Sequence, residues 1–292
     1  MEDLLTVART TYRPLECRPD SYRGWYQQGQ LCWLEGNVDE ALLCYHRALE
    51  YYPNDYWAWY HLAIAHEKLG HVDEAITAYQ RACAIGPENY WSWYDQGCLY
   101  MEVLQVYTQA IACFEKALAA QPNDYWAIYR QGECWRLLGR QDRAVTAYDR
   151  ALEFRPGDYW CWYRRGDALQ AWGKPEAALA SYDQALNAKP NDFWAWYQRG
   201  NTLASLGNYP AAIAAFTQAL IDAPDDAETW YAQARCLAQI GDGQGAFRSL
   251  EKAIALDPLT YFPQAETAPC FTPLRSLASW ENLQQLAQPT QA

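Results

Sequence analysis

The chain has 292 residues, of which 51% are apolar and 15% aromatic, so it can bury a substantial core and disorder is excluded as its default state. Its formal net charge of -12 argues against a sequence-independent grip on nucleic acid, which needs clustered Lys and Arg, and against spontaneous binding to anionic lipids. There is no long apolar run, and the N-terminus is acidic where a secretory signal is basic, so we expect no integral membrane segment and a cytoplasmic location.

Residues 1–18 show no repeated pattern and are predicted to form an N-terminal arm. From residue 19 onward, prolines recur every 34 or 35 residues, at Pro19, Pro53, Pro87, Pro122, Pro156, Pro190, Pro224 and Pro258. A fixed period of this length is typical of repeat architectures. We therefore predict seven repeats over residues 19–258, bounded at 19–53, 53–87, 87–122, 122–156, 156–190, 190–224 and 224–258.

Each repeat is predicted to be a helical hairpin. If position 1 is the third residue after each proline, position 8 is always Gly or Ala, and a small residue there lets two helices approach closely. A glycine at position 15 can adopt a left-handed conformation and end the first helix. The third repeat lacks this glycine and carries one extra residue, with Gln105 near its turn, so we expect a distorted hairpin there. In the second helix, residues such as Ala178, Tyr182 and Ala185 make one i, i+4, i+7 face.

The region 259–292 differs from the repeats. It contains three prolines, followed by apolar residues at helical spacing, which are Leu274, Leu277, Trp280, Leu283 and Leu286. This spacing predicts a capping helix over the last hairpin, with a frayed polar tail after it.

The Trp, Gly, Tyr, Ala, aromatic, Ala and Pro marks over residues 19–258 resemble the tetratricopeptide repeat family. The resemblance implies an all-α fold, a right-handed α-solenoid of seven helical hairpins with a C-terminal capping helix. It also implies that the first helix of each hairpin lines the concave side. Because each hairpin contacts only its neighbours, we expect an elongated monomer or weak oligomer.

Five repeats open with a nearly identical aromatic string, such as Tyr56-Trp57-Ala58-Trp59-Tyr60. At about 100° per residue, positions 4, 7, 8 and 11 share a packing face, while positions 2, 5, 9 and 12 share another face. We call the second face the aromatic stripe. Its rings are Trp57, Tyr60, Trp91, Tyr94, Trp126, Tyr129, Trp160, Tyr163, Trp194 and Tyr197, and its polar residues include Glu133, Arg136, Asp167 and Asn201.

We predict that the stripe binds a protein or peptide partner, since Trp and Tyr contribute binding area at low entropic cost. Arg23 and Glu228 replace the position-2 tryptophan in the first and seventh repeats, which confines the stripe to the middle of the chain. Two other interpretations stay open. The stripe could carry a flat apolar ligand such as a pigment or tetrapyrrole, or its rings could stack between hairpins as a purely structural ladder.

The family resemblance narrows the class of partner that we expect. Family members that capture a C-terminal carboxylate use Lys, Asn and Arg at positions 5 and 9, whereas position 5 here is always Tyr, so that role is disfavoured. The aromatic strings are also similar to repeats in tetratricopeptide proteins of photosynthetic bacteria, some of which assist photosystem or pigment-enzyme assembly. This likeness implies an assembly factor, and allows peripheral association with a membrane-bound partner. Single-stranded nucleic acid is disfavoured because the stripe lacks a basic groove.

No catalytic constellation is visible. The chain has no P-loop and no Gly-rich dinucleotide turn. His61, His66 and His71 are five residues apart, unlike the i, i+4 spacing that places two metal ligands on one helix face. We therefore predict a non-enzymatic scaffold with no catalytic residue, no metal and no cofactor.

Overall fold

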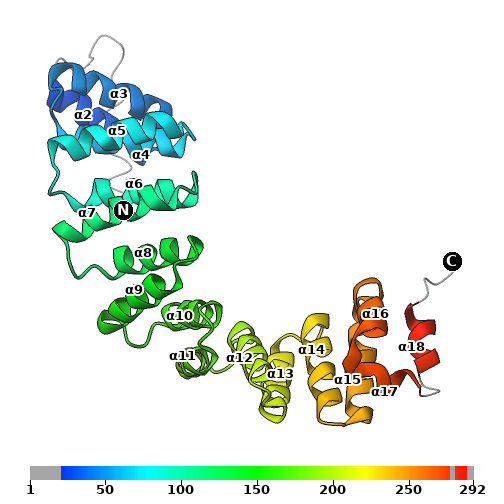
Figure 1. Cartoon of the computed structure of the whole chain (residues 1–292). Helices are drawn as coiled ribbons and strands as arrows, with labels where there is room; N and C mark the ends of the chain where they lie inside the picture. The colour runs from blue at the N-terminus through cyan, green and yellow to red at the C-terminus, as the bar shows by residue number, and fades with distance from the viewer. Residues whose placement is uncertain (1–20, 277–279, 288–292) are drawn as a thin grey trace, which may run out of the picture. The chain divides into compact units, whose positions relative to one another are not determined.

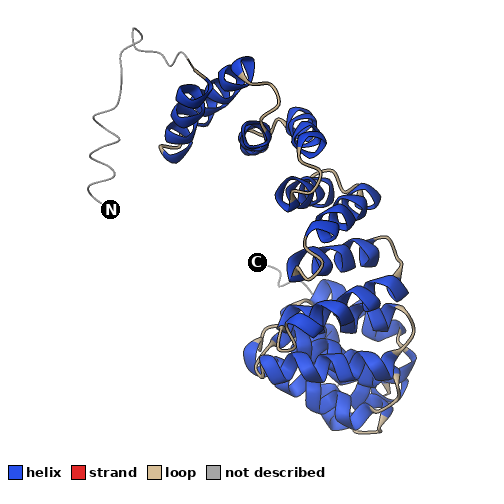
Figure 2. Ribbon diagram, turned by 90° about the vertical axis from the view of Figure 1, so that its left-hand side faces the viewer, coloured by secondary structure: helices blue, strands red, loops and turns tan. Residues whose placement is uncertain are grey.

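A computed structural model describes residues 21–276 and 280–287, and all of its regular elements are helices (Figures 1 and 2). The chain divides into two compact units, Met1–Leu138 and Gly139–Ala292, whose boundary falls between the two helices of the fourth repeat. The arm predicted for residues 1–18 and the end of the tail, 288–292, lie outside the described residues.

From residue 21 onward, the first unit contains three hairpins and one further helix. Its helices are α2 (Tyr22–Leu34), α3 (Val38–Tyr51), α4 (Tyr56–Lys68), α5 (Val72–Ile85), α6 (Tyr90–Glu102), α7 (Tyr107–Ala120) and α8 (Tyr125–Leu137). The pairs α2/α3, α4/α5 and α6/α7 are the hairpins, and the second helix of each also packs on the first helix of the next repeat. Successive colours in Figure 1 follow this order.

The second unit repeats the arrangement. Its helices before the cap are α9 (Gln141–Phe154), α10 (Tyr159–Ala171), α11 (Pro175–Ala188), α12 (Phe193–Ser205), α13 (Tyr209–Asp222), α14 (Ala227–Gln239) and α15 (Gly243–Leu256). Here α10/α11, α12/α13 and α14/α15 are the hairpins, and α9 packs on α10. The all-α repeat fold predicted from the sequence is therefore confirmed.

The turn glycines have the left-handed conformation that the sequence predicts. Gly173 has a φ of 76°, and five equivalent glycines have φ between 73° and 82°. In the third repeat the turn is one residue longer, and Gln105 takes the positive φ, at 56°. The expected distortion is thus local, because one residue still supplies the left-handed step.

Replacing Gln105 with glycine is expected to stabilise the first unit by about 1 kcal/mol, because a side chain at positive φ is strained and glycine is not. Urea unfolding of the two proteins measures the difference. Gly70→Ala, which puts a side chain at the equivalent φ of 77°, should destabilise the same unit and serves as the matched control. An unchanged or lower stability for Gln105→Gly would contradict this account of the turn.

The small residue at position 8 lies against an aromatic ring of the second helix. A Cβ atom built on Gly166 would be 2.5 Å from Cε1 of Tyr182, and one on Gly200 would be 2.6 Å from Cε1 of Phe216. Both rings are fully buried. The close helix approach within each hairpin therefore depends on the missing side chain.

The aspartate that precedes the first helix of a repeat bonds to the position-1 tyrosine of the preceding repeat, and this Asp-Tyr pair joins neighbouring hairpins. Asp124 caps α8 by accepting from the backbone N–H of Ala127 at 2.7 Å, and it also accepts from the hydroxyl of Tyr90 in the preceding repeat at 2.8 Å. Asp192 caps α12 and accepts from the Tyr159 hydroxyl in the same way. One carboxylate thus stabilises a helix start and links two repeats.

The cap of the last hairpin has more parts than the single helix predicted. It consists of α16 (Pro258–Thr267), a short 3-10 turn η2 (Pro269–Phe271), α17 (Thr272–Arg275) and α18 (Trp280–Ala287). Trp280 and Leu283 of α18 are buried against α15 and α16, as the apolar spacing predicts. The sequence did not predict α16, because Pro258 was used only as the boundary of the last repeat although proline also suits the first turn of a helix.

Candidate functional site

The position-2 tryptophans of the aromatic stripe are large, half-exposed side chains, and we call them the tryptophan row. Their exposed fractions are 46% for Trp57, 51% for Trp91 and 47% for Trp126 in the first unit, and 50% for Trp160 and 56% for Trp194 in the second. Each stands one residue after the start of a first helix, so its helix fixes its direction. Half of each indole is thus available to a partner.

Rings of the same repeat hold each tryptophan edge-on. The centroid of Trp57 lies 5.0 Å from that of Tyr56 and 5.8 Å from that of Tyr60, with both ring pairs nearly perpendicular. Trp160 has the same arrangement, 5.0 Å from Tyr159 and 6.2 Å from Tyr163. These contacts lie within one repeat. The tryptophan row is therefore presented by a rigid tyrosine base, which lowers the entropy lost on binding.

The position-5 tyrosines are committed to contacts between repeats. The Tyr60 hydroxyl donates to Asp95 of the next repeat at 2.7 Å, and Tyr197 donates to Glu228 at 2.6 Å. Burial and the Asp95 carboxylate raise the pKa of Tyr60, so its hydroxyl stays protonated and acts as a donor. Tyr94 instead accepts from Nε of Arg130 at 3.1 Å. These tyrosines join hairpins and leave the exposed area to the tryptophans.

Several predicted polar residues of the stripe bond to neighbours in their own unit. Glu133 is buried and pairs with Arg136, with Nη2 and Oε2 3.0 Å apart. Asp167 accepts from the Tyr182 hydroxyl at 3.0 Å and from Arg164 at 3.3 Å. The Asp167–Tyr182 bond joins α10 to α11, whereas Glu133 and Arg136 pair within α8.

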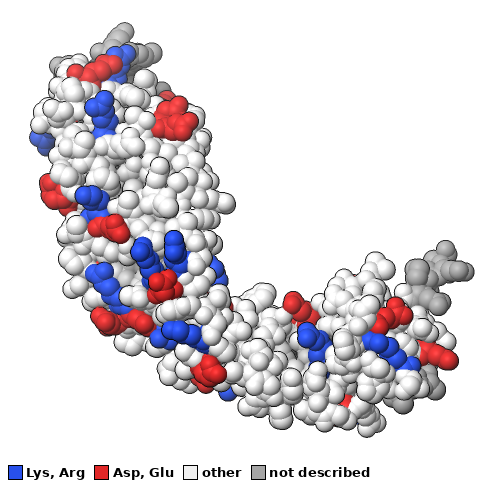
Figure 3. Space-filling view, viewed as in Figure 1, with Lys and Arg blue, Asp and Glu red and all other residues white. Residues whose placement is uncertain are grey.

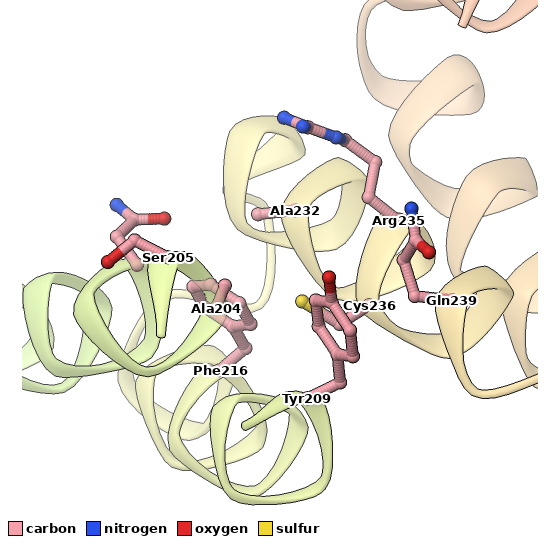
Figure 4. Close-up of a pocket in the computed structure, with 9 residues that line it drawn as sticks. Ala204, Ser205, Tyr209, Phe216, Ala232, Arg235, Cys236 and Gln239 are labelled. Atoms are coloured by element: carbon pink, nitrogen blue, oxygen red, sulfur yellow. The ribbon is translucent and has the colours of Figure 1, made fainter. Parts of the chain in front are cut away.

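Asn201 lies at a cavity of about 290 Å³ in the second unit (Figure 4). Its walls come from α12, α13 and α14, and include Ser205, Tyr209, Arg235 and Gln239. An equivalent cavity of about 460 Å³ in the first unit is lined by residues that include Ile64, Glu67 and Cys98. Both cavities are bounded by residues at positions 9 and 12 or 13, and neither takes a wall from the tryptophan row.

Charged side chains around the stripe occur mainly in pairs. Arg165 contacts Asp149 at 2.6 Å, and Arg199 contacts Asp183 at 2.7 Å. On the face drawn in Figure 3, basic and acidic groups lie beside one another with wide uncharged areas between them. Basic groups on that face are therefore interleaved with acidic ones.

Other kinds of site find little support in the part of the chain that the structure describes. None of its helices is both long and apolar enough to cross a membrane. Within the same residues, no three His, Cys, Asp or Glu side chains are grouped so that they could hold a metal ion. The three histidines considered above as metal ligands lie in the first unit, where burial lowers the pKa of His61 and of His66.

Family models match most of the repeat region. One model described as tetratricopeptide repeat matches residues 26–90, 94–159 and 197–259, and two related models match residues 166–207 and 147–180. No curated protein matches the chain by sequence.

Solved structures share the fold at low sequence identity. The C-terminal part of a repeat protein from Cytophaga hutchinsonii has a TM-score of 0.69 at 16% identity, and the match covers 83% of this chain and 99% of that one. A repeat protein from Parabacteroides merdae has a TM-score of 0.58 at 15% identity, covering 92% and 99%. YrrB, described as having an unusual peptide-binding site, has a TM-score of 0.58 at 23% identity, covering 65% and 98%. At these identities the likeness concerns the fold alone.

Proposed function

Because the chain belongs to the tetratricopeptide repeat family, we propose that it is a non-enzymatic scaffold or assembly factor that binds segments of partner proteins through the tryptophan row. The observation that carries this proposal is the exposure of five equivalent tryptophans, each between 46% and 56%. Aromatic anchors of this kind contribute much of the affinity at protein interfaces. The peptide-binding site named for YrrB supports a peptide or protein ligand for the same fold.

The purely structural ladder has less support. In the repeats of Trp57 and Trp160, the ring contacts of the tryptophan stay within the repeat, whereas the tyrosine hydroxyls bond to the next repeat. Packing between repeats therefore uses the tyrosines and leaves an indole face open. The same geometry favours a partner over an enclosed flat ligand, since no tryptophan of the row lines either of the two cavities described above.

The setting of this binding is also part of the proposal. The likeness of the aromatic strings to repeats of photosynthetic bacteria favours an assembly role in the cytoplasm, with a membrane-bound partner reached from the surface. Identification of the captured partner tests whether the protein has this assembly role and whether the partner is bound to a membrane.

Substituting leucine for Trp57, Trp91, Trp160 and Trp194 together is expected to abolish partner capture, and each single change should weaken binding about tenfold. Leucine keeps an apolar side chain on the tyrosine base, so helicity should be retained. Affinity capture from extracts of the source cells with mass spectrometry, followed by calorimetry with the partner identified, measures the effect.

The matched control is Trp172→Leu. Trp172 is 41% exposed and belongs to the same helical region as Trp160, but stands at the C-terminal end of α10, outside the stripe. It should capture the wild-type set of partners. Recovery of that same set by the fourfold variant, with helicity intact by circular dichroism, would refute the proposed function.

A further inference from the structure

The residue after each second helix stands against the rings that open the same repeat. This C-cap residue has nearly the same backbone conformation in each hairpin, with φ between -138° and -127° at Tyr52, Gly86, Gln121, Lys189 and Ala223. A side chain at this position therefore leaves the backbone in the same direction each time. In this direction the side chain faces the two rings at positions 1 and 2 of the same repeat.

Two repeats show this contact, in the first repeat with the position-1 ring alone, and the backbone of a third repeat is placed for it. Tyr52 lies edge-on to Tyr22 with 5.7 Å between centroids, and a Cβ atom on Gly86 would be 3.0 Å from Cδ2 of Tyr56. In the fifth repeat, Nζ of Lys189 lies 4.4 Å from the ring centroid of Tyr159 and 5.4 Å from that of Trp160. The chain thus already places an ammonium group on one ring pair.

Three further ring pairs have no lysine or arginine at the C-cap position of their repeat. The C-cap residue is Gly86 in the repeat of Tyr56 and Trp57, Gln121 in that of Tyr90 and Trp91, and Ala223 in that of Phe193 and Trp194. Within the described residues, no lysine or arginine lies over Trp57, Trp91 or Trp194, although Lys189 covers the ring pair of the fifth repeat. These three tryptophans are 46%, 51% and 56% exposed.

The electrostatic setting also favours a cation at the Tyr90–Trp91 pair. The hydroxyl of Tyr159 bonds to Asp192, so a carboxylate stands at the edge of the ring pair that Lys189 covers. Asp124 stands at the edge of the pair of Tyr90 in the same way, at 2.8 Å. With a formal net charge of -12, the chain attracts basic segments over a longer range as well.

We propose that the ring pairs Tyr56–Trp57 and Tyr90–Trp91 of the first unit, and Phe193–Trp194 of the second, each bind a Lys or Arg side chain of basic partner segments, as the pair Tyr159–Trp160 binds Lys189. This inference rests on the proposed function and specifies its partner. A cation over an indole face is attracted by the ring quadrupole, and each such contact contributes roughly two- to fivefold in affinity at an exposed site.

The test uses the full chain and labelled synthetic peptides of alternating lysine and serine, with norleucine in place of lysine as the uncharged counterpart. Fluorescence anisotropy should show about tenfold or more tighter binding of the lysine peptide, as several ring pairs contribute. Trp57→Leu, Trp91→Leu and Trp194→Leu combined should remove that preference. Equal binding of the norleucine peptide, lost in the same triple variant, would overturn the cation inference but leave the proposed function standing.

Two single substitutions test the mechanism from within the chain. Ala223→Lys places a lysine where Lys189 stands in the previous repeat, and should weaken the lysine peptide about two- to fivefold by occupying the Phe193–Trp194 pair. Lys189→Ala should strengthen it by a similar factor by opening the Tyr159–Trp160 pair. The charge controls are Gln218→Lys, exposed on α13, and Lys174→Ala, whose ammonium lies 3.3 Å from the ring of Trp172 outside the stripe.

The controls separate local from general electrostatics. Gln218→Lys is compared with Ala223→Lys, and Lys174→Ala with Lys189→Ala. If each control changes the affinity for the lysine peptide as much as the variant it is compared with, net charge alone governs binding and the inference is overturned. Absence of any binding of the lysine peptide to the wild-type chain overturns it as well. Binding of the lysine peptide that the triple tryptophan variant leaves unchanged overturns this inference, while the proposed function is decided by partner capture with the fourfold variant.

Discussion

Gly166→Leu is expected to destabilise the second unit by about 3 kcal/mol or more, the largest effect of any single change considered for that unit. A Cβ atom at this position would stand 2.5 Å from Cε1 and 2.8 Å from Cζ of Tyr182, well inside contact distance. The ring cannot swing away freely, because it is 1% exposed and its hydroxyl bonds to Asp167 at 3.0 Å. Helices α10 and α11 would have to separate.

The comparison with Trp160→Leu makes this result informative. Trp160 lies on the same helix, but half of its surface already faces water, so its replacement should cost less than about 1 kcal/mol. Urea unfolding and hydrogen exchange of the α10 and α11 amides measure both variants. Equal destabilisation would mean that the tryptophan row is part of the core, which would favour the structural ladder over partner binding.

The hairpins could be predicted from the sequence because their determinants are local. A glycine at position 15 ends the first helix whatever surrounds it, and the structure gives Gly173 the expected positive φ. The period supports this inference, since the glycine recurs at this position in six of the seven repeats. The cap was harder, because Pro258 can end one helix or begin the next, and only its packing decides.

The candidate site could be predicted only in part. Helical geometry alone separates position 2 from the packing face, and the tryptophans there are exposed as expected. Geometry on one helix could not show that the Tyr60 hydroxyl would reach Asp95, because this partner lies in another repeat. Helix geometry predicts the i, i+3 pairing of Glu133 with Arg136, but it could not show that Glu133 would be buried.

The role of the C-cap residue was missed for the same reason. Lys189 is far from Tyr159 in sequence, and their contact exists only once α11 folds back along α10. A signal was available, since the residue before each repeat proline varies widely while the rings stay constant. Variation beside a constant aromatic pair indicates a position that adjusts the ring surface.

Asp192→Ala is expected to destabilise the second unit by about 3 kcal/mol, because one carboxylate serves two functions. It caps α12 by accepting from the backbone N–H of Ala195 at 3.0 Å, and loss of an N-cap costs about 1 kcal/mol. It also accepts from the Tyr159 hydroxyl, and a hydrogen bond to a charged group contributes about 1.5 to 3 kcal/mol. Burial and the Asp192 carboxylate raise the pKa of Tyr159, so the tyrosine donates throughout the accessible pH range.

A double-mutant cycle with Tyr159→Phe separates the two functions, because this change removes the bond between repeats and leaves the cap in place. The next repeat offers the reverse test. Phe193 packs on Trp194 at 5.0 Å and 74°, as Tyr159 packs on Trp160 at 5.0 Å and 75°, but it lacks the hydroxyl. Thr229 bonds to Asp226 through Oδ2, so Phe193→Tyr can donate to Oδ1 and should stabilise the unit by about 1 kcal/mol. If Tyr159→Phe costs nothing and Phe193→Tyr gains nothing in urea unfolding, the Asp-Tyr pair does not link the repeats, and its recurrence reflects helix capping alone.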